Sequence, residues 1–384
     1  MSSVEADTDA VLNLIPAPRL APYLALTGGD PGRALSLYEW GARVSAAAFE
    51  DVAHLEVLFR GSMDGVLRSH FREAERGIPW FLSPVPGVEY AVEASGYVRE
   101  RLRQEGRETR DQIVAAMSFG FWSGMLGPGY EELWRSCLHR AFPGSSGRRS
   151  EVAATAEGVR RFRNRIAHHD SVLNVDFPFE VRRIAALAGF VDPAAGRWLE
   201  RRSRTADVYA DRPVTLDDTL VVSDPGAPAL YERSRAHVTR AGRAFAGVEH
   251  LAFRVDGEIA PELPGVLLRR DNVEWTERGA IRLRRTRDPW DRRIAETIEA
   301  SLGDGRNEGR RQVFLLTAPG EPGHRRLAAA LPVSGAGLAG AGEGEGHGSA
   351  PGTEGRGGGS EPEYAYTRLH ALENGTAPDP PPAD

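Results

Sequence analysis

Apolar residues recur at alternating three- and four-residue steps in the first half of this 384-residue chain. From Phe49 onward, such a face contains, in order, Val52, Glu56, Phe59, Met63, Val66 and His70. This spacing predicts one face of a long helix, with the polar residues Glu56 and His70 on an otherwise apolar stripe. Another periodic segment is expected after Asp30-Pro31, where an acceptor side chain precedes a proline suited to the first turn.

Further helical patterns cover residues 110–125, 130–141, 151–168 and 179–188, while strand-like alternation is nearly absent. We therefore predict a mainly helical domain over residues 17–212. After Arg212-Pro213 the pattern changes to short strands at 220–222, 250–255, 265–268 and 312–316, with helical composition at 229–245 and 290–302. This mixture predicts a small α+β domain over residues 213–333.

The last 51 residues, 334–384, contain 13 glycines and almost no apolar clusters. Burial cannot offset the entropy of ordering such a segment, so we predict a disordered tail in which Tyr364-Ala365-Tyr366 is at most a short docking motif. Residues 331–384 hold two Arg against eight acidic residues, which matches the net charge of −6 for the whole chain. The folded part is therefore neutral, and the molecule is not a polycation that coats nucleic acid.

The residue types also restrict location and cofactors. The single cysteine, Cys137, excludes an intramolecular disulfide and a Cys-rich zinc site, and is compatible with a cytoplasmic protein. No signal peptide is visible, and glycines and serines interrupt the uncharged stretch Ile113 to Tyr130, so we expect a buried helix and no membrane partner. Cys137 and His139 lie on different helix faces, and we expect neither a metal nor a cofactor.

The densest polar constellation is Arg163-Asn164-Arg165-Ile166-Ala167-His168-His169. Helical spacing puts Asn164 and His168 one turn apart, with Arg163 beside the same edge. Histidine can take or give a proton near neutral pH, and a guanidinium can hold two phosphate oxygens. These groups suit cleavage of RNA without a metal, in which the ribose 2′-OH attacks the adjacent phosphorus. Spacing alone equally allows cations that only complement the helix dipole.

The constellation resembles the RNRxAHH signature of the Abi-like family, the abortive-infection proteins of the AbiD/AbiF type. Three other segments agree in order: Ala34 to Trp40 with Ser45 and Phe49, Leu55 to Arg60, and Ser118 to Ser123 with Leu133-Trp134 and Phe142-Pro143. The similarity covers residues 17–212. It implies a HEPN-type helical bundle, whose members often act as dimeric RNases in conflict with phage.

The resemblance also implies roles for individual residues. His168 would be the acid or base, Arg163 the phosphate clamp and Asn164 an orienting residue, while His169 is either a structural neighbour or exchanges roles with His168. The family usually has Asn where Gly61 follows Arg60, so any site contact made by that Asn is missing. Glu56 and Arg60 are one turn apart, and we expect an auxiliary, structural ion pair between them.

Three functions remain open at this point. The first is an RNase effector of abortive infection that cleaves host or phage RNA as a homodimer, under the control of a protein regulator. The second is a non-catalytic HEPN module that binds RNA, a nucleotide or a protein partner, and a buried Arg163 paired with Glu56 would count heavily for it and against catalysis. The third is a scaffold whose acidic tail recruits partners. In the second domain, the arginines from Arg269 to Arg287 could line an RNA-binding face, but interleaved acidic residues favour a solvated surface. Within this cluster, Ile281 and Leu283 alternate with arginines, which suits a strand with one face buried and one solvated.

Overall fold

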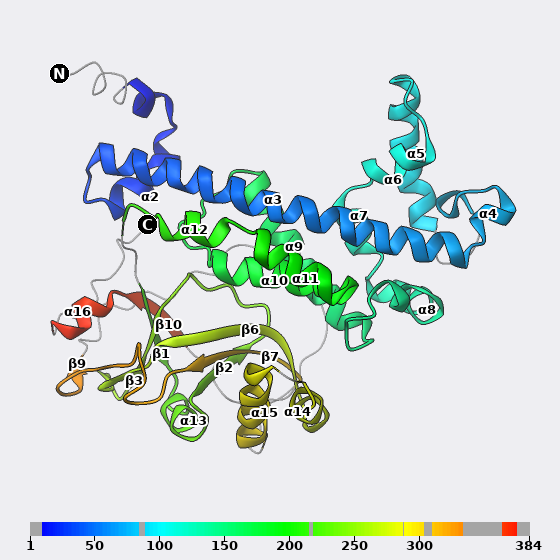
Figure 1. The fold of residues 1–384 in the computed structure, drawn as a ribbon. Helices are drawn as coiled ribbons and strands as arrows, with labels where there is room; N and C mark the ends of the chain where they lie inside the picture. Colours follow the sequence, from blue (N-terminus) through cyan, green and yellow to red (C-terminus); the bar gives the residue numbers. More distant parts are fainter. Residues whose placement is uncertain are drawn as a thin grey trace. The chain divides into compact units, whose positions relative to one another are not determined.

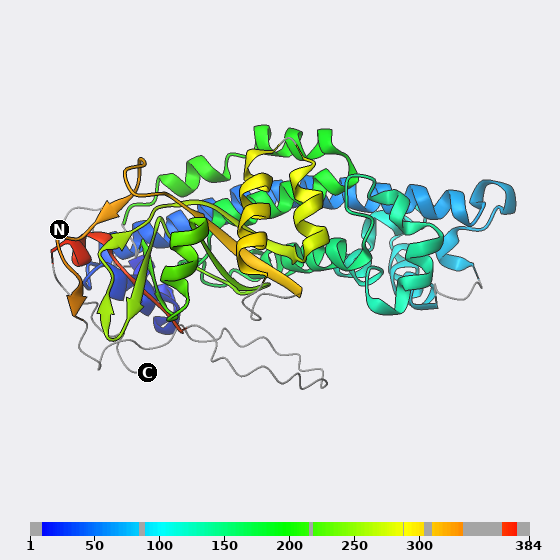
Figure 2. The ribbon, with the colours of Figure 1, turned by 90° about the horizontal axis from the view of Figure 1, so that it is seen from below.

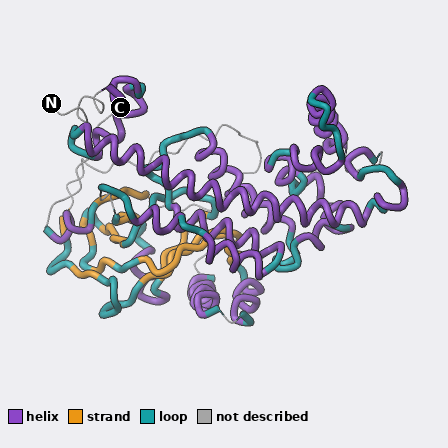
Figure 3. The backbone as a smooth tube through the Cα atoms, turned by 45° about the horizontal axis from the view of Figure 1, so that its top comes forward, coloured by secondary structure: helices purple, strands orange, loops and turns teal. Residues whose placement is uncertain are grey.

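The computed structural model describes residues 10–83, 89–214, 218–286, 288–302, 309–332 and 363–374. The chain divides into two units, Met1–Val214 and Thr215–Asp384. In Figure 3 the strands gather in the second unit, whereas the first is built of helices. The prediction of a mainly α protein with a smaller mixed unit is therefore confirmed at this coarse level, while the HEPN-type fold stays a prediction.

The first unit is organised around one long helix, α3 (Pro31–His70), which is drawn in blue in Figure 1. The remaining elements are the helices α2 (Ala17–Leu26), α4 (Glu73–Arg76), α5 (Glu89–Gln104), α6 (Arg110–Ala116), α7 (Phe119–Gly124), α8 (Glu131–Ser136), α9 (Arg149–Ala167), α10 (Phe177–Val191), α11 (Pro193–Arg202) and α12 (Thr205–Ala210), and the short turns η1 (Trp80–Leu82), η2 (Pro128–Tyr130) and η3 (Leu138–Ala141). Helices α9, α10 and α12 pack against α3.

Helix α3 begins as its sequence predicts, and the middle of its predicted apolar face is buried, whereas Phe49 and His70 at the two ends of that face are exposed. The side chain of Asp30 accepts a hydrogen bond from the backbone N–H of Arg33, at 2.9 Å, and Pro31 occupies the first turn. On the inner face, Trp40, Phe59 and Met63 are fully buried in the core of the unit. Glu56 lies at the border of that face and stays partly exposed, so the polar residue on the stripe is placed where water reaches it.

Two predicted helices are each broken in the structure. The segment 110–125 forms α6 and α7, because the Ser118 hydroxyl accepts a hydrogen bond from the backbone N–H of Phe121, at 3.2 Å, and starts a new helix. The segment 130–141 divides into η2, α8 and η3, with a non-helical backbone at Cys137 (φ −149°, ψ −44°) ending α8. The predicted helices at 151–168 and 179–188 are confirmed as α9 and α10.

The described residues of the second unit form three sheets and four helices. Its elements are β1 (Thr219–Ser223), α13 (Ala227–Ser234), β2 (Ala236–Arg240), β3 (His250–Val255), β4 (Glu258–Ile259), β5 (Glu262–Leu263), β6 (Val266–Trp275), α14 (Glu277–Arg284), α15 (Pro289–Ser301), β7 (Gly309–Leu316), β8 (Arg325–Arg326), β9 (Leu331–Pro332), β10 (Glu363–Thr367) and α16 (Leu369–Glu373). The strand orders are β10-β1-β3-β4-β9, β2-β7-β6 and β5-β8.

The sheet β2-β7-β6 is buried on both faces. On one face Val313 and Leu315 of β7 pack with α13, α14 and α15, and Figure 2 shows α14 and α15 side by side there. On the other face Phe314 and Leu316 pack against Leu220 of β1 and its neighbours in the five-stranded sheet. The alternation along β7 therefore serves two separate cores, which explains its near-continuous apolar sequence.

Three predictions for the second unit are wrong. Residues 229–245 are not one helix, because α13 ends at Ser234 and β2 follows. The alternation of Ile281 and Leu283 with arginines is not a strand but part of α14, whose N-terminus is capped by the Thr276 hydroxyl. Residues 363–374 of the predicted disordered tail form β10 and α16, and Val222 of β1 lies opposite Tyr364 of β10. The rest of that tail lies outside the described residues.

Candidate functional site

The site begins at the C-terminal end of α9. His168 is the C-cap residue, and His169 follows it with a left-handed backbone conformation (φ 56°). The backbone N–H of His169 donates to the carbonyl of Ile166 at 3.2 Å, and that of Asp170 donates to the carbonyl of Arg165 at 3.0 Å. This is the Schellman pattern that ends many helices, and its left-handed position is usually a glycine. Both histidines are exposed.

A histidine at the left-handed position is held there by another element. The Arg19 guanidinium of α2 donates a hydrogen bond to the backbone carbonyl of His169. A non-glycine residue pays a steric cost of the order of 1 kcal/mol in this conformation, and such positions cluster at functional sites. The sequence therefore keeps an imidazole at a place where glycine would fit with less strain.

Arg163 lies less than two turns before the helix end and is paired with α3. Its Nε donates to the Glu56 carboxylate at 3.3 Å, and its Nη1 donates to Oδ1 of Asn164 at 3.5 Å. The Arg163 and Glu56 side chains are 32% and 26% exposed, so water reaches both members of the pair. Arg163 is thus oriented by its neighbours while part of the guanidinium remains open to solvent.

The expected ion pair between Glu56 and Arg60 does not form. Arg60 instead donates to the backbone carbonyl of Ala115 at 3.1 Å, while Glu56 turns to Arg163 of α9. The prediction is wrong because one-turn spacing on α3 only made the pair feasible, whereas the packing of α9 offered Glu56 a second guanidinium. Arg60 is consequently a structural residue that ties α3 to the segment before α7, and Glu56 is the residue that contacts the motif.

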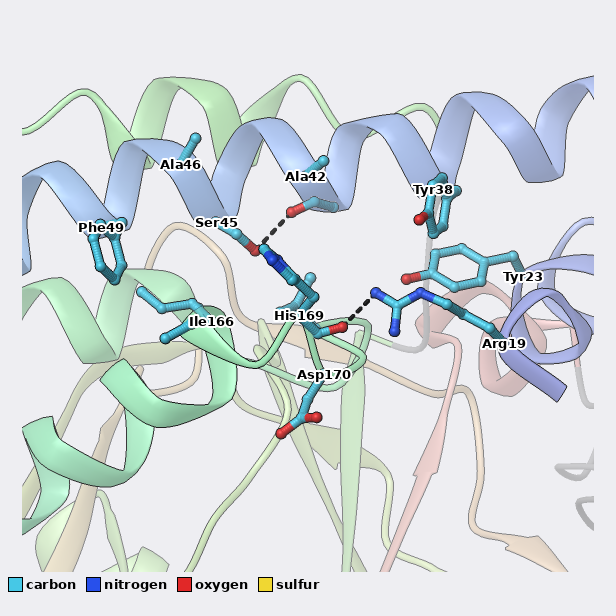
Figure 4. Close-up of a pocket in the computed structure, with 13 residues that line it drawn as sticks. Arg19, Tyr23, Tyr38, Ala42, Ser45, Ala46, Phe49, Ile166, His169 and Asp170 are labelled. Atoms are coloured by element: carbon cyan, nitrogen blue, oxygen red, sulfur yellow. Dashed lines mark hydrogen bonds between the residues drawn. The ribbon is translucent and has the colours of Figure 1, made fainter. Parts of the chain in front are cut away.

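A pocket of about 480 Å³ opens beside the helix end, between α2, α3 and the residues after α9 (Figure 4). Its lining comprises Arg19, Tyr23, Tyr38, Gly41, Ala42, Ser45, Ala46, Phe49, Ile166, Ala167, His169, Asp170 and Val172. In Figure 4 the His169 side chain points toward Ser45, whereas the Asp170 carboxylate turns away from α3. Arg163, Asn164 and His168 do not line this pocket.

The structure therefore divides the predicted site. His169 faces the pocket, His168 is exposed at the helix end, and Arg163 with Asn164 lies further back along α9. The sequence reasoning missed Arg19, which comes from α2. Tyr38, Ser45 and Phe49 had a signal, because the segment Ala34 to Trp40 with Ser45 and Phe49 carries the family resemblance. No local pattern marks Arg19, which is 150 residues away from its partner His169.

Other candidate groups are accounted for by structure. Cys137 is buried, and burial raises the pKa of its thiol, which disfavours the nucleophilic thiolate. Within the described residues, no three His, Cys, Asp or Glu side chains gather as metal ligands, and no helix is long and apolar enough to cross a membrane.

The arginines of the second unit are largely engaged with partners. Arg269 is buried and donates to Gln312 at 2.9 Å, and Arg270 pairs with both Asp288 and Asp291. Arg282 pairs with Glu274, while Arg287 lies outside the described residues. The acidic partners of Arg270 and Arg282 fit the predicted charge-balanced surface, whereas the prediction of a solvated face is wrong for Arg269, which is 5% exposed and hydrogen-bonded within the sheet β2-β7-β6.

No family model, curated protein or solved structure matches the chain. The resemblance to the Abi-like family is therefore carried by the quoted segments alone and stays a prediction.

Proposed function

We propose that the first unit is a metal-independent endoribonuclease of an abortive-infection system, which cleaves host or phage RNA. The observation that supports this best is the end of α9, where two exposed imidazoles follow a partly exposed, pre-oriented guanidinium. These are the groups that attack by a ribose 2′-OH requires: a proton acceptor, a proton donor and a cation for the charged phosphate. His168 is exposed, so a polymeric substrate can reach its ring.

In this proposal Arg163 binds the scissile phosphate and Asn164 helps to orient it. The pair with Glu56 keeps the guanidinium in place before RNA arrives, and a phosphate then competes with the carboxylate for the exposed N–H groups. His168 takes or gives the proton, and His169 borders the same end of the helix. A homodimer supplies a second copy of the motif, so that base and acid can come from His168 of different subunits.

The pairing of Arg163 with Glu56 also favours a second candidate, a HEPN module that binds RNA, a nucleotide or a protein without cleaving. In that case the motif serves fold and dimer contacts, and Arg163 is a structural cation. The two candidates differ in what Arg163→Ala and His168→Ala do, because only the RNase loses a chemical step with them.

The test is inducible expression of the full chain in a bacterial host beside Arg163→Ala, His168→Ala and Arg43→Gln. Arg43 is an exposed residue of α3, paired only loosely with Glu39 at 3.9 Å, and serves as the control for loss of one cation. We expect wild type and Arg43→Gln to arrest growth and fragment RNA, and the two motif variants, verified as folded dimers, to do neither. Equal behaviour of all four chains during phage challenge would refute the RNase and favour the binding module.

A further inference from the structure

The pocket beside α9 has the size and the walls of a small-molecule site. Its volume of about 480 Å³ falls within the usual range of roughly 300–1,000 Å³ for ligand pockets. Tyr23 and Tyr38 meet edge to face with ring centroids 5.5 Å apart. Phe49 lies further along α3 at the other end of the lining and is 41% exposed, which leaves its ring open to a partner. The walls thus suit a planar aromatic group.

A cation stands at the same pocket. The Arg19 guanidinium is held by the His169 carbonyl and lies 5.7 Å from the centroid of the Tyr38 ring. Among the described residues, no carboxylate lies within ion-pair distance of it. Its remaining N–H groups are therefore free to bind an anion, and a fork of guanidinium N–H donors matches the oxygens of a phosphate.

Polar groups line the wall between the aromatic residues. The Ser45 hydroxyl donates to the Gly41 carbonyl at 2.7 Å, so its own oxygen can accept a hydrogen bond from a ligand. The His169 side chain points toward Ser45 in Figure 4 and adds a ring nitrogen that can donate or accept. Such donors and acceptors, set among aromatic and aliphatic walls, match the edge of a nucleobase.

We propose that this pocket binds a nucleoside monophosphate unit, with the base against the aromatic wall and the phosphate on Arg19. The assignment of that unit to single-stranded RNA rests on the function proposed above. The binding of a nucleoside monophosphate follows from the pocket residues alone and does not depend on that function. In the RNA case, one nucleotide next to the scissile bond leaves the stack and occupies the pocket, and His169 and Arg19 select the position of cleavage.

The test measures binding to the full-length protein by calorimetry. The ligands are the four ribonucleoside monophosphates and the matching trinucleotides, which carry 2′-O-methyl groups so that they cannot be cleaved. Ala46→Leu enlarges a side chain of the lining with a good helix former at an exposed position of α3, and Arg19→Gln removes the cation. Arg43→Gln, on the same helix but outside the lining, is the control for charge.

We expect Ala46→Leu and Arg19→Gln each to weaken binding by at least about tenfold, in keeping with the contribution of base stacking on aromatic rings, and Arg43→Gln to change it by less than about twofold. Tighter binding of a trinucleotide than of its monophosphate supports the RNA strand as the source, and the reverse supports a free nucleotide. Unchanged affinity in both pocket variants, or no binding to wild type, would overturn the proposal.

The proposal and the proposed function can fail separately. If nucleotides bind through the pocket but the protein cleaves no RNA, the pocket assignment is supported and the RNase proposal is refuted. If RNA is cleaved while both pocket variants bind nucleotides as the wild type does, the RNase stands and the pocket assignment is wrong.

Discussion

Replacement of Glu56 by glutamine tests whether Arg163 binds a phosphate or is only a structural cation. In the free protein the carboxylate and the guanidinium are 3.3 Å apart and both are partly exposed. Ion pairs with this much water access contribute about 0.2–1 kcal/mol. If RNA phosphate competes with Glu56, Glu56→Gln removes that competition and strengthens RNA binding by up to about 1 kcal/mol, or about fivefold. The same substitution should lower the unfolding free energy of the first unit by no more than about 1 kcal/mol.

The assay is fluorescence anisotropy with a labelled single-stranded RNA, in a His168→Ala background that prevents cleavage. Affinity is measured from about 50 to 200 mM salt, because each newly engaged phosphate steepens the logarithmic salt dependence by about 0.7 for single strands. The matched control is Glu100→Gln, which removes an exposed carboxylate that pairs with Arg103 at 3.3 Å on α5. This control changes the net charge equally, but its guanidinium partner lies outside the motif.

We expect a tighter complex for Glu56→Gln with the salt dependence of the wild type, because the same phosphate is bound, and at most a small, nonspecific gain in affinity for Glu100→Gln. Arg163→Gln should weaken binding and make the logarithmic salt dependence shallower by about 0.7. Equal affinities for the two glutamate variants, together with an unchanged slope for Arg163→Gln, would refute the reasoning, since Arg163 would then contact no phosphate and the Glu56 pair would be purely structural.

Three further predictions concern stability and its link to the site. His169→Gly should raise the unfolding free energy of the first unit by up to about 1 kcal/mol in thermal denaturation, because a backbone φ of 56° suits glycine. The same variant should lower RNA cleavage. A destabilised variant would contradict the idea that the His169 backbone is strained. Burial lowers the pKa of His237 to about 4 from its usual 6.5, so the unfolded chain binds one more proton between these values. The second unit should therefore lose up to about 3 kcal/mol as pH falls from about 6.5 to about 4, and His237→Gln should flatten that dependence in urea titrations. Tyr364→Ala should destabilise the second unit by about 3 kcal/mol, and Tyr364→Phe by about 1 kcal/mol through loss of the 3.0 Å hydrogen bond to His237. RNA cleavage should be unaffected in both variants. If β10 contributes nothing to the stability of the second unit, the chemical denaturation midpoint will stay unchanged.

Local signals in the sequence predicted the elements whose ends are set locally. Asp30 and Pro31 mark the start of α3 because a cap and a first-turn proline act within a few residues. The break at Ser118 was missed because apolar periodicity continues across it, and the hydroxyl cap is visible only once the chain turns. For residues 281–284, four positions are too few to separate the two-residue period of a strand from helical spacing, and the Thr276 cap decides the outcome.

Features that depend on distant contacts could not be predicted in the same way. The strand β10 comes from a Gly-rich tail. It forms because it pairs with the edge of β1 and because Tyr364 hydrogen-bonds to the buried His237. At the site, the motif on α9 was visible as residue types at helical spacing. The partner of Glu56 and the position of Arg19 depend on how α2, α3 and α9 pack, which no spacing within one helix specifies.

The measurement that tests the central claim most directly is cleavage of RNA by the purified full-length protein in the presence of a chelator. The substrates are a short RNA and the same oligonucleotide with a single 2′-deoxy sugar at the cleaved position. The account predicts that the RNA is cut to ends carrying a 2′,3′-cyclic phosphate, that the 2′-deoxy position resists, and that His168→Ala and Arg163→Ala abolish cleavage. Cleavage at the deoxy position, or cleavage that survives in both folded variants, would contradict the account.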